Sequence, residues 1–199
     1  MVRVKSLRFW NNILSTVVIL LGLYIAGAPF LPLAKLWLKQ RTDKTSGVPY
    51  SGQLAQIDNV KRADPPKDNR LVIPSISLNE PINEGNNIWV IHNGGTWRLP
   101  KSVAPTEQGN SVIVGHRFYG SNGSTFYNLD RVKLGEKMAV YWQGKELIYK
   151  VSDIKVVPPS AIEVEAPTND RRLTLYTCTP LWTAKDRLVI TALPEETQQ

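Results

Sequence analysis

The chain has 199 residues, which is enough for one domain of ordinary size with a hydrophobic core. Its net charge of +7 is unevenly distributed: residues 1–44 hold seven basic residues and one acidic residue, whereas residues 45–199 hold 17 and 16. The near-neutral larger part lacks the electrostatic footprint of a nucleic-acid-binding protein, and we attribute the basic excess to a membrane-associated N-terminal segment.

The first predicted element is a transmembrane helix over residues 13–33, ILSTVVILLGLYIAGAPFLPL. The segment has no charged residue, and as a helix it is long enough to cross a hydrocarbon core of about 30 Å. Trp10 and Trp37 lie near its two ends, as interfacial aromatic residues do, and Lys35 and Lys39 mark its second boundary. Length and composition therefore predict a membrane span.

A cleaved signal peptide is the alternative, because Ala26-Gly27-Ala28 resembles a cleavage site. Pro29 follows directly and the apolar run continues, so we predict an uncleaved signal anchor instead. The positive-inside rule barely decides the orientation, since similar numbers of basic residues flank the span. The shortness of residues 1–12 favours a cytoplasmic N-terminus, with the rest of the chain outside the cell.

Residues 34–69 are predicted to form a juxtamembrane segment and linker. From residue 42 onwards this stretch is polar, contains Gly, Ser and Pro, and has no sustained period. Leu54, Ile57 and Val60 have helical spacing, which also allows a short helix here.

Residues 70–199 are predicted to form an all-β domain with short helical turns at 125–129 and 159–162. Short apolar β-type runs alternate with turn signals, and no long amphipathic helix is evident. This spacing predicts a closed antiparallel barrel or a sandwich. The runs are 71–74, 88–92, 111–116, 137–142, 146–157, 172–178 and 187–193.

Cys178 is the only cysteine in the chain, within the sequence TLYTCTP. A lone cysteine in a strand is usually a small buried apolar residue. In an exported domain, however, structural cysteines are generally paired, and Cys178 has no partner in the chain. It is therefore also a candidate for an intermolecular disulfide or a reactive thiol.

A nucleophilic cysteine needs an acid–base partner and a group that stabilises developing negative charge. His92 and His116 each end a β-type run, and by position alone they are equal candidates. Arg187 opens the run after Cys178, so hairpin pairing of the two strands would bring them together. The alternative for Arg187 is a solvated surface residue paired with Asp186.

Other chemistry has little support in the sequence. There is no Cys/His spacing of a metal site, no phosphate-binding glycine loop and no G-x-S-x-G elbow. Glu163, Glu165 and Asp170 lack the order of a calcium-binding loop, so we interpret them as a solvated loop. We predict neither a metal nor a cofactor.

Taken together, four motifs resemble those of the sortases, membrane-anchored cysteine transpeptidases of bacterial surfaces. The resemblance covers roughly residues 70–193, and the N-terminal anchor agrees with it. The motifs are Thr174-Leu175-Tyr176-Thr177-Cys178, Val112-Ile113-Val114-Gly115-His116-Arg117, Ile73-Pro74 with Ile76, and Arg187 with Leu188-Val189-Ile190.

This resemblance implies a closed eight-stranded sortase-type β-barrel. It places His116, Cys178 and Arg187 at the catalytic positions and leaves His92 outside the histidine motif. Thr177 is expected to contribute to substrate or oxyanion contacts. Residues 158–171 correspond to the family's region that recognises the Leu-Pro part of the substrate.

The resemblance also implies the reaction and the partners. Sortases cleave a Leu-Pro-x-Thr-Gly-like sorting signal between Thr and Gly and pass the acyl group to an amine on a cell-wall precursor or a pilin lysine. A Leu-Ala-x-Thr-Gly-like signal is the related possibility. The expected partners are sorting-signal peptides of secreted surface proteins, an amine nucleophile and the membrane, with no nucleic acid.

Residues 96–100 (TWRLP) and Pro180 look most like class E or related class D housekeeping-type sortases. The Asp-Pro-aromatic lid of pilin-polymerising enzymes is not supported, because Asp64-Pro65 is followed by Pro66. The calcium-binding cluster of some class A members is not evident, since Glu107 stands alone in its stretch.

Three alternatives to a sortase remain at this stage. An L,D-type transpeptidase requires a Ser-His-Gly-Cys-x-Arg-like context, which the residues around Cys178 do not supply. A sortase-fold thiol hydrolase would use water as the acceptor. A non-enzymatic, membrane-anchored β domain that binds a surface partner would require all of the motifs to be accidental.

Overall fold

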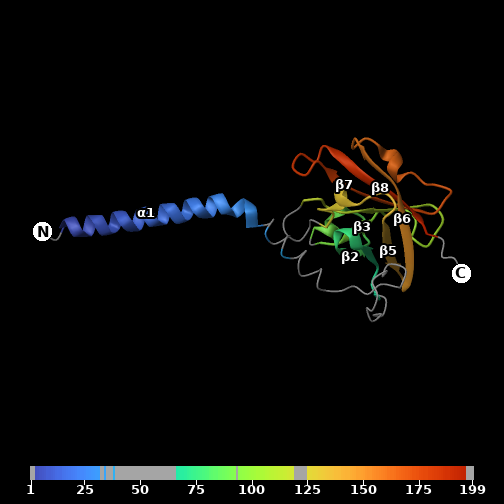
Figure 1. The fold of residues 1–199 in the computed structure, drawn as a ribbon, viewed down its shortest axis with the longest axis horizontal. Coiled ribbons are helices and arrows are strands. Elements are labelled where there is room, and N and C mark those ends of the chain that lie inside the picture. Colours follow the sequence, from blue (N-terminus) through green and yellow to red (C-terminus); the bar gives the residue numbers. More distant parts are fainter. Residues whose placement is uncertain are drawn as a thin grey trace. The chain divides into compact units, whose positions relative to one another are not determined.

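The computed structural model describes residues 3–31, 34, 38, 66–92, 94–118 and 125–195 (Figure 1). The chain divides into two compact units, residues 1–39 and residues 40–199. The predicted linker 34–69 lies almost wholly outside the described residues, and so do the helical spacing at residues 54–60 and the Asp64-Pro65 pair.

The N-terminal unit is one long helix, α1 (Arg3–Gly27), followed by a 3₁₀ turn, η1 (Ala28–Phe30). Its segment Phe9–Gly27 is long and apolar enough to cross a membrane, and none of this segment is buried inside the protein. The hydroxyl of Thr16 donates a hydrogen bond of 2.9 Å to the carbonyl of Asn12, which satisfies this polar group within the helix. The helix is therefore a candidate membrane span.

The second unit is a closed barrel of eight strands in the order β1-β2-β3-β4-β7-β8-β6-β5. The predicted closed eight-stranded β-barrel is thereby confirmed. Closure pairs every strand on both sides, so no sheet edge is left open. The strands are β1 (Arg70–Ile73), β2 (Leu78–Asn83), β3 (Thr96–Arg98), β4 (Asn110–Val114), β5 (Lys137–Trp142), β6 (Lys145–Val157), β7 (Arg172–Thr179) and β8 (Asp186–Pro194).

The sheet is mixed, whereas an antiparallel barrel was expected. Within the described residues, β2 pairs with β3 and β4 pairs with β7 in parallel, and the other neighbours are antiparallel. The β4–β7 pair matters most for function, because it joins the histidine motif to the cysteine motif.

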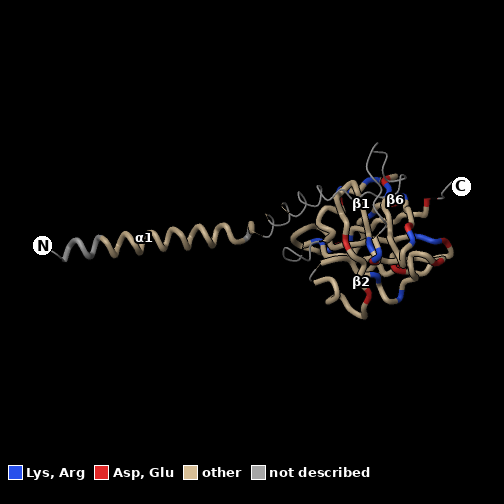
Figure 2. The backbone as a smooth tube through the Cα atoms, turned by 90° about the horizontal axis from the view of Figure 1, so that it is seen from below, with Lys and Arg blue, Asp and Glu red and all other residues tan. Residues whose placement is uncertain are grey.

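Alternating residues of the strands point into the barrel and form one core cluster, as the period of two in a β-strand requires. The buried Tyr149 donates its hydroxyl to the carbonyl of Pro105 over 2.7 Å, so its polar end is satisfied. Burial raises the pKa of Tyr149 to about 12. On the outside, Figure 2 shows basic and acidic residues interspersed over the barrel, in agreement with its near-neutral charge.

One predicted β-type run is wrong, and two strands were not predicted. Residues 88–92 form the 3₁₀ helix η3 (Ile88–Ile91), which the Asn87 side chain caps by accepting from the backbone N–H of Trp89. β2 was missed because its sequence, LNEPIN, is polar and contains Pro81, and β3 was missed because it has only three residues.

Three further 3₁₀ turns connect the strands: η2 (Pro74–Ile76), η4 (Leu129–Arg131) and η5 (Ile162–Glu165). The helical turn predicted at 159–162 is found slightly later, as η5. The segment predicted as a turn at 125–129 leads into η4.

Candidate active site

Cys178 and Arg187 lie directly opposite each other in the antiparallel pair β7–β8. Directly opposed residues of antiparallel strands project from the same face, with Cβ atoms about 5 Å apart. Nη1 of Arg187 donates to the carbonyls of Ala184 (3.2 Å) and Asp186 (3.1 Å), which fixes the guanidinium at the end of the β7–β8 loop. The structure therefore brings the predicted thiol and the predicted cation together.

His116 reaches the same place through the parallel pair β4–β7. Val114 is paired with Tyr176, and the contact continues beyond β4 because the N–H of Gly115 donates to the carbonyl of Tyr176 over 3.4 Å. Extending this register by two residues places His116 level with Cys178. Three adjacent strand ends thus hold the three predicted catalytic residues side by side.

Cys178 faces outwards from the barrel. Along β7, Leu173, Leu175 and Thr177 of the inward face are buried, whereas Tyr176 and Cys178 of the outward face are partly exposed. Thr174, also on the outward face, is buried beside Asn110, to which its hydroxyl donates. The thiol therefore lies where a peptide can reach it, and it is not part of the core.

Thr177, predicted to contact the substrate, has a buried side chain that is 2% exposed. Its hydroxyl donates to the carbonyl of Gly115 over 2.8 Å. The hydroxyl therefore joins β7 to the segment that carries His116, and a contact with the substrate would have to come from the backbone of Thr177.

His116 is partly buried, and His92 lies next to it. Their ring centroids are 5.3 Å apart, with an angle of 44° between the rings. Burial lowers the pKa of His116 below its usual range, and the nearby His92 lowers it further. The sequence motif favoured His116 alone, whereas the structure places both histidines of the chain at the site.

Arg117 is a site residue that the sequence reasoning did not single out. It is buried, its Nη1 donates to the hydroxyl of Thr179 over 2.9 Å, and its Nη2 forms an ion pair of 2.6 Å with Asp130. The residue that follows His116 is thus hydrogen-bonded to the residue that follows Cys178. In the sequence Arg117 is the last residue of the histidine motif, to which no role of its own was assigned.

The loop before β7 is fixed to the sheet by Asn110. The Nδ2 group of this buried side chain donates to the carbonyls of Val164 (3.0 Å) and Ala166 (3.1 Å), and its Oδ1 accepts from the hydroxyl of Thr174 at 2.7 Å. These bonds hold η5 against β4 and against β7, the strand that carries Cys178.

A second contact of this loop involves Tyr176, which lies on the same face of β7 as Cys178. Its hydroxyl donates to Oε1 of Glu165 over 2.6 Å. Burial, followed by the Glu165 contact, raises the pKa of Tyr176 above its usual range. Tyr176 therefore acts as a neutral hydrogen-bond donor at neutral pH.

Comparison with known proteins decides the family. The family model described as the sortase domain matches residues 71–195, more than half of the chain. The chain belongs to the sortase family.

This sortase is 30% identical to Sortase A of Streptococcus agalactiae serotype III (strain NEM316) over 132 residues, covering 64% of this chain and 52% of that protein. It is 29% identical to Sortase SrtE1 of Streptomyces coelicolor over 135 residues, covering 60% of this chain and 38% of that protein. The chain therefore spans about half, or less, of the length of these curated relatives.

Solved sortase structures share its fold. Sortase A from Corynebacterium diphtheriae, a lid mutant, has a TM-score of 0.60 at 30% identity, covering 85% of this chain and 96% of that one. Sortase E1 from Streptomyces coelicolor, with a tripeptide in its active site, has a TM-score of 0.58 at 27% identity, covering 67% and 92%.

Aromatic side chains connect the two loops beside the site of this sortase. Phe118, two residues after His116, packs edge-on against Trp182 of the β7–β8 loop, with ring centroids 4.8 Å apart. Trp182 is largely exposed. The contact joins the segments that follow the histidine and the cysteine.

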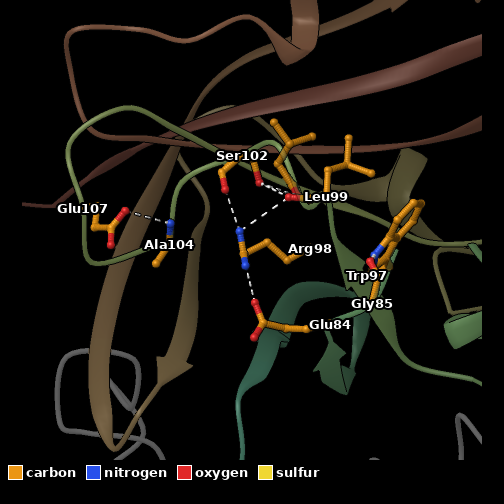
Figure 3. Close-up of polar contacts among 9 residues, drawn as sticks. Glu84, Gly85, Trp97, Arg98, Leu99, Ser102, Ala104 and Glu107 are labelled. Carbon is orange, nitrogen blue, oxygen red and sulfur yellow. Dashed lines mark hydrogen bonds and ion pairs between the residues drawn. The ribbon is translucent and has the colours of Figure 1, made fainter. Parts of the chain in front are cut away.

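The TWRLP segment of this sortase holds neighbouring loops in place (Figure 3). Nε1 of Trp97 donates to the carbonyl of Gly85 over 2.8 Å, in the segment that leads to η3. Arg98 pairs with Glu84 and donates to the carbonyl of Ser102 over 2.6 Å. Through these contacts, Trp97 and Arg98 of β3 hold both the loop before η3 and the loop after β3.

The acidic residues considered as cation ligands have other contacts. Glu107 accepts a hydrogen bond from the backbone N–H of Ala104 within its own loop, as Figure 3 shows, and Asp170 forms an ion pair with Arg172. Across the part of the chain that the structure describes, no group of three His, Cys, Asp or Glu side chains is arranged to hold a metal ion.

Proposed function

We propose that this sortase is a membrane-anchored cysteine transpeptidase that cleaves a sorting signal of the Leu-Pro-x-Thr-Gly or Leu-Ala-x-Thr-Gly type between Thr and Gly. The product is transferred to an amine on a cell-wall precursor or a pilin. The observation that carries the proposal is the meeting of His116, Cys178 and Arg187 at three adjacent strand ends.

In the first half-reaction, the thiolate of Cys178 attacks the carbonyl carbon of the threonine. The carbon–nitrogen bond to glycine then breaks, and the imidazolium of His116 gives its proton to the leaving amine. The product is a thioacyl-enzyme, and the free amine of the glycine fragment departs.

In the second half-reaction, the acceptor amine attacks the thioacyl carbon. Neutral His116 takes the amine proton, and the Cys178 thiolate leaves, so the ion pair is restored. Arg187 keeps its charge throughout and donates to the developing oxyanion or to the substrate backbone. Its position opposite Cys178 supports this role.

Residues 158–171 are proposed to recognise the first part of the signal. Asn110 and Tyr176 fix η5 of this loop beside the outward face of Cys178, which supports the assignment. The tripeptide in the active site of the Streptomyces coelicolor relative supports a peptide ligand here by similarity. We also propose that the backbone of Thr177 contacts the substrate. For the enzyme as a whole, we propose sortase class E or D.

The proposed arrangement in the cell is a single-pass membrane protein with an extracellular catalytic domain. In it, residues 1–12 are cytoplasmic, 13–33 form the signal anchor, 34–69 the juxtamembrane segment and linker, and 70–199 the catalytic domain. The apolar segment Phe9–Gly27 of α1 and the family's membrane anchoring support this arrangement.

The test is acyl-enzyme formation by the full-length chain in detergent micelles. We incubate it with a panel of both signal types, with and without an amine, and follow the intact mass. We expect an added acyl fragment on the wild type and none on Cys178→Ala. Absence of any adduct across the panel contradicts the proposal.

The same assay separates a transpeptidase from a hydrolase. A transpeptidase gives the amide of the added amine as its main product. A product that remains the free acid at saturating amine identifies the sortase-fold thiol hydrolase instead.

A further inference from the structure

His92 lies between the candidate catalytic histidine and an exposed tryptophan. On one side its ring is 5.3 Å from that of His116, tilted by 44°. On the other side the ring of Trp89 packs edge-on at 4.1 Å, with an angle of 63°. The chain has only two histidines, and both take part in this series of ring contacts.

Side-chain hydrogen bonds fix the segment that carries His92. Asn87 caps the start of η3, and Nδ2 of Asn83 donates to the carbonyls of Val90 (3.3 Å) and Gly94 (3.4 Å) on either side of His92. Trp97 holds the carbonyl of Gly85 at the approach to η3 (Figure 3). The position of His92 is therefore determined by the fold.

The side chain of Ile91, the residue before His92, is also completely buried. A buried anchor and hydrogen bonds before and after the histidine leave η3 little freedom to move away from β3, the strand that it contacts. The fold of the barrel domain thus fixes the contact between the two imidazoles.

We propose that His92 is a positioning residue for His116: it supports one side of the catalytic imidazole and, when protonated, opposes a second positive charge there. This inference rests on the proposed acid–base role of His116. His92 itself makes no bond to the substrate in this scheme.

The electrostatic part follows from the spacing of the two rings. At the dielectric constant of water, a positive charge about 5 Å away lowers the pKa of an imidazole by about half a unit, and in less polar surroundings by more. Burial is the larger reason for the lowered pKa of His116, and His92 is the second. Among the described residues, the other titratable or charged groups on the elements around His116 include Cys178 and Tyr176 on β7, Asp186 and Arg187 on β8, the adjacent Arg117, and Asp130 and Arg131 of η4.

A charge on His92 therefore lowers the pH at which His116 loses its proton. Protonated His116 is needed for departure of the amine, and neutral His116 is needed for acceptance of the next one. By lowering the pH at which His116 loses its proton, His92 favours the form that activates the acceptor.

The test is a titration of His116 by NMR in the full-length chain in micelles, with ¹³C-labelled histidine. His92→Phe leaves a single imidazole, so its signal is assigned without ambiguity. His92→Gln removes the charge without keeping a ring. We expect both variants to raise the midpoint of His116 by about half a pH unit at low salt, with a smaller difference in 1 M salt.

A second measurement addresses the packing. We expect the acylation rate of His92→Ala to fall on the order of tenfold below that of His92→Phe, because a displaced imidazole transfers protons poorly. The alkaline limb of the pH–rate profile for acylation by His92→Phe should move up with the midpoint of His116, because acylation needs the protonated imidazole.

An unchanged midpoint of His116 in both His92→Phe and His92→Gln overturns the inference. Equal acylation rates of His92→Ala and His92→Phe overturn its packing part. The titration needs no substrate, so it still decides the role of His92 if the wild type acylates no peptide, an outcome that would contradict the proposed function alone.

Discussion

Gly115 shows how a single missing side chain shapes the site. A Cβ atom at this position would lie 2.8 Å from Cδ2 of Phe126 and 3.0 Å from its Cγ, closer than real Cβ atoms come. Phe126 is completely buried, so its ring has little room to move away. The glycine of the histidine motif is therefore required for the close approach of the β4 end to the core.

We predict that Gly115→Ala lowers the free energy of unfolding by about 1–3 kcal/mol, the usual cost of overpacking. It should also slow acylation, because the strain displaces the neighbouring His116. Thermal unfolding monitored by near-UV circular dichroism measures the first effect. Phe126→Leu in the Gly115→Ala background should restore part of both, and a double variant no better than Gly115→Ala would refute this explanation.

The lowered pKa of His116 has a consequence for stability. Its cause is mainly burial, so the unfolded chain binds this proton more readily than the folded chain. Stability therefore falls as the pH drops from the unfolded value, about 6.5, towards the folded value, and it is unaffected by this group above that range.

We expect the Tm of the wild type to fall between about pH 6.5 and pH 5 more steeply than that of His116→Gln. Calorimetry of both proteins over this range measures the difference. Parallel pH profiles would show that burial of His116 does not contribute to acid sensitivity.

At the scale of elements, one buried amide connects the loop that carries η5 to two strands. Asn110 donates to two loop carbonyls and accepts from Thr174, so its replacement leaves three polar groups without their partners. By contrast, the Tyr176–Glu165 bond of the same loop joins a partly buried hydroxyl to an exposed carboxylate.

We predict that Asn110→Leu costs about 1–3 kcal/mol of stability and raises the KM for the signal peptide more than it changes kcat. The reason is that the loop loses its fixed position while Cys178 keeps its neighbours on β4 and β8. Tyr176→Phe is the matched control, with a smaller loss of about 1 kcal/mol or less. If Asn110→Leu changes only kcat, the loop does not bind the peptide as proposed.

Strands with strong local patterns were predictable from sequence, and those defined by tertiary contacts were not. The run 137–142 coincides with β5, β7 ends one residue later than its predicted run, and β8 extends one residue further at each end. The run 88–92 is apolar but forms η3, because Asn87 caps a helical turn there. Periodicity does not distinguish a short buried strand from a short helix.

The same distinction applies to the site. Proximity of Arg187 to Cys178 follows from a local hairpin, so it was predictable. His116 reaches Cys178 through parallel pairing of strands 62 residues apart, which only the family motif indicated. Contacts of His92 and Arg117 with the site depend on η3 and η4, which no motif marks.

At the scale of the whole molecule, the two units have different surfaces. The barrel carries mixed charges outside and most of its apolar residues inside, whereas α1 from Phe9 to Gly27 is exposed and mostly apolar, with no charged residue. Exposed Leu, Ile and Val in such a run are unfavourable in water and favourable in hydrocarbon. The proposed anchor is therefore supported by the energetics of α1, independently of the chemistry in the barrel.

We predict that the full chain stays in the membrane fraction after a carbonate wash and that Leu20→Arg combined with Leu21→Arg releases it. Each arginine at the centre of a span costs about 2.5–3.5 kcal/mol on insertion scales, so the pair removes much of the gain from burying α1. Leu20→Ile combined with Leu21→Ile is the matched control and should remain in the membrane. Protease added to intact cells should digest the barrel if residues 70–199 lie outside, and protection from it would reverse the proposed orientation while leaving the anchor intact.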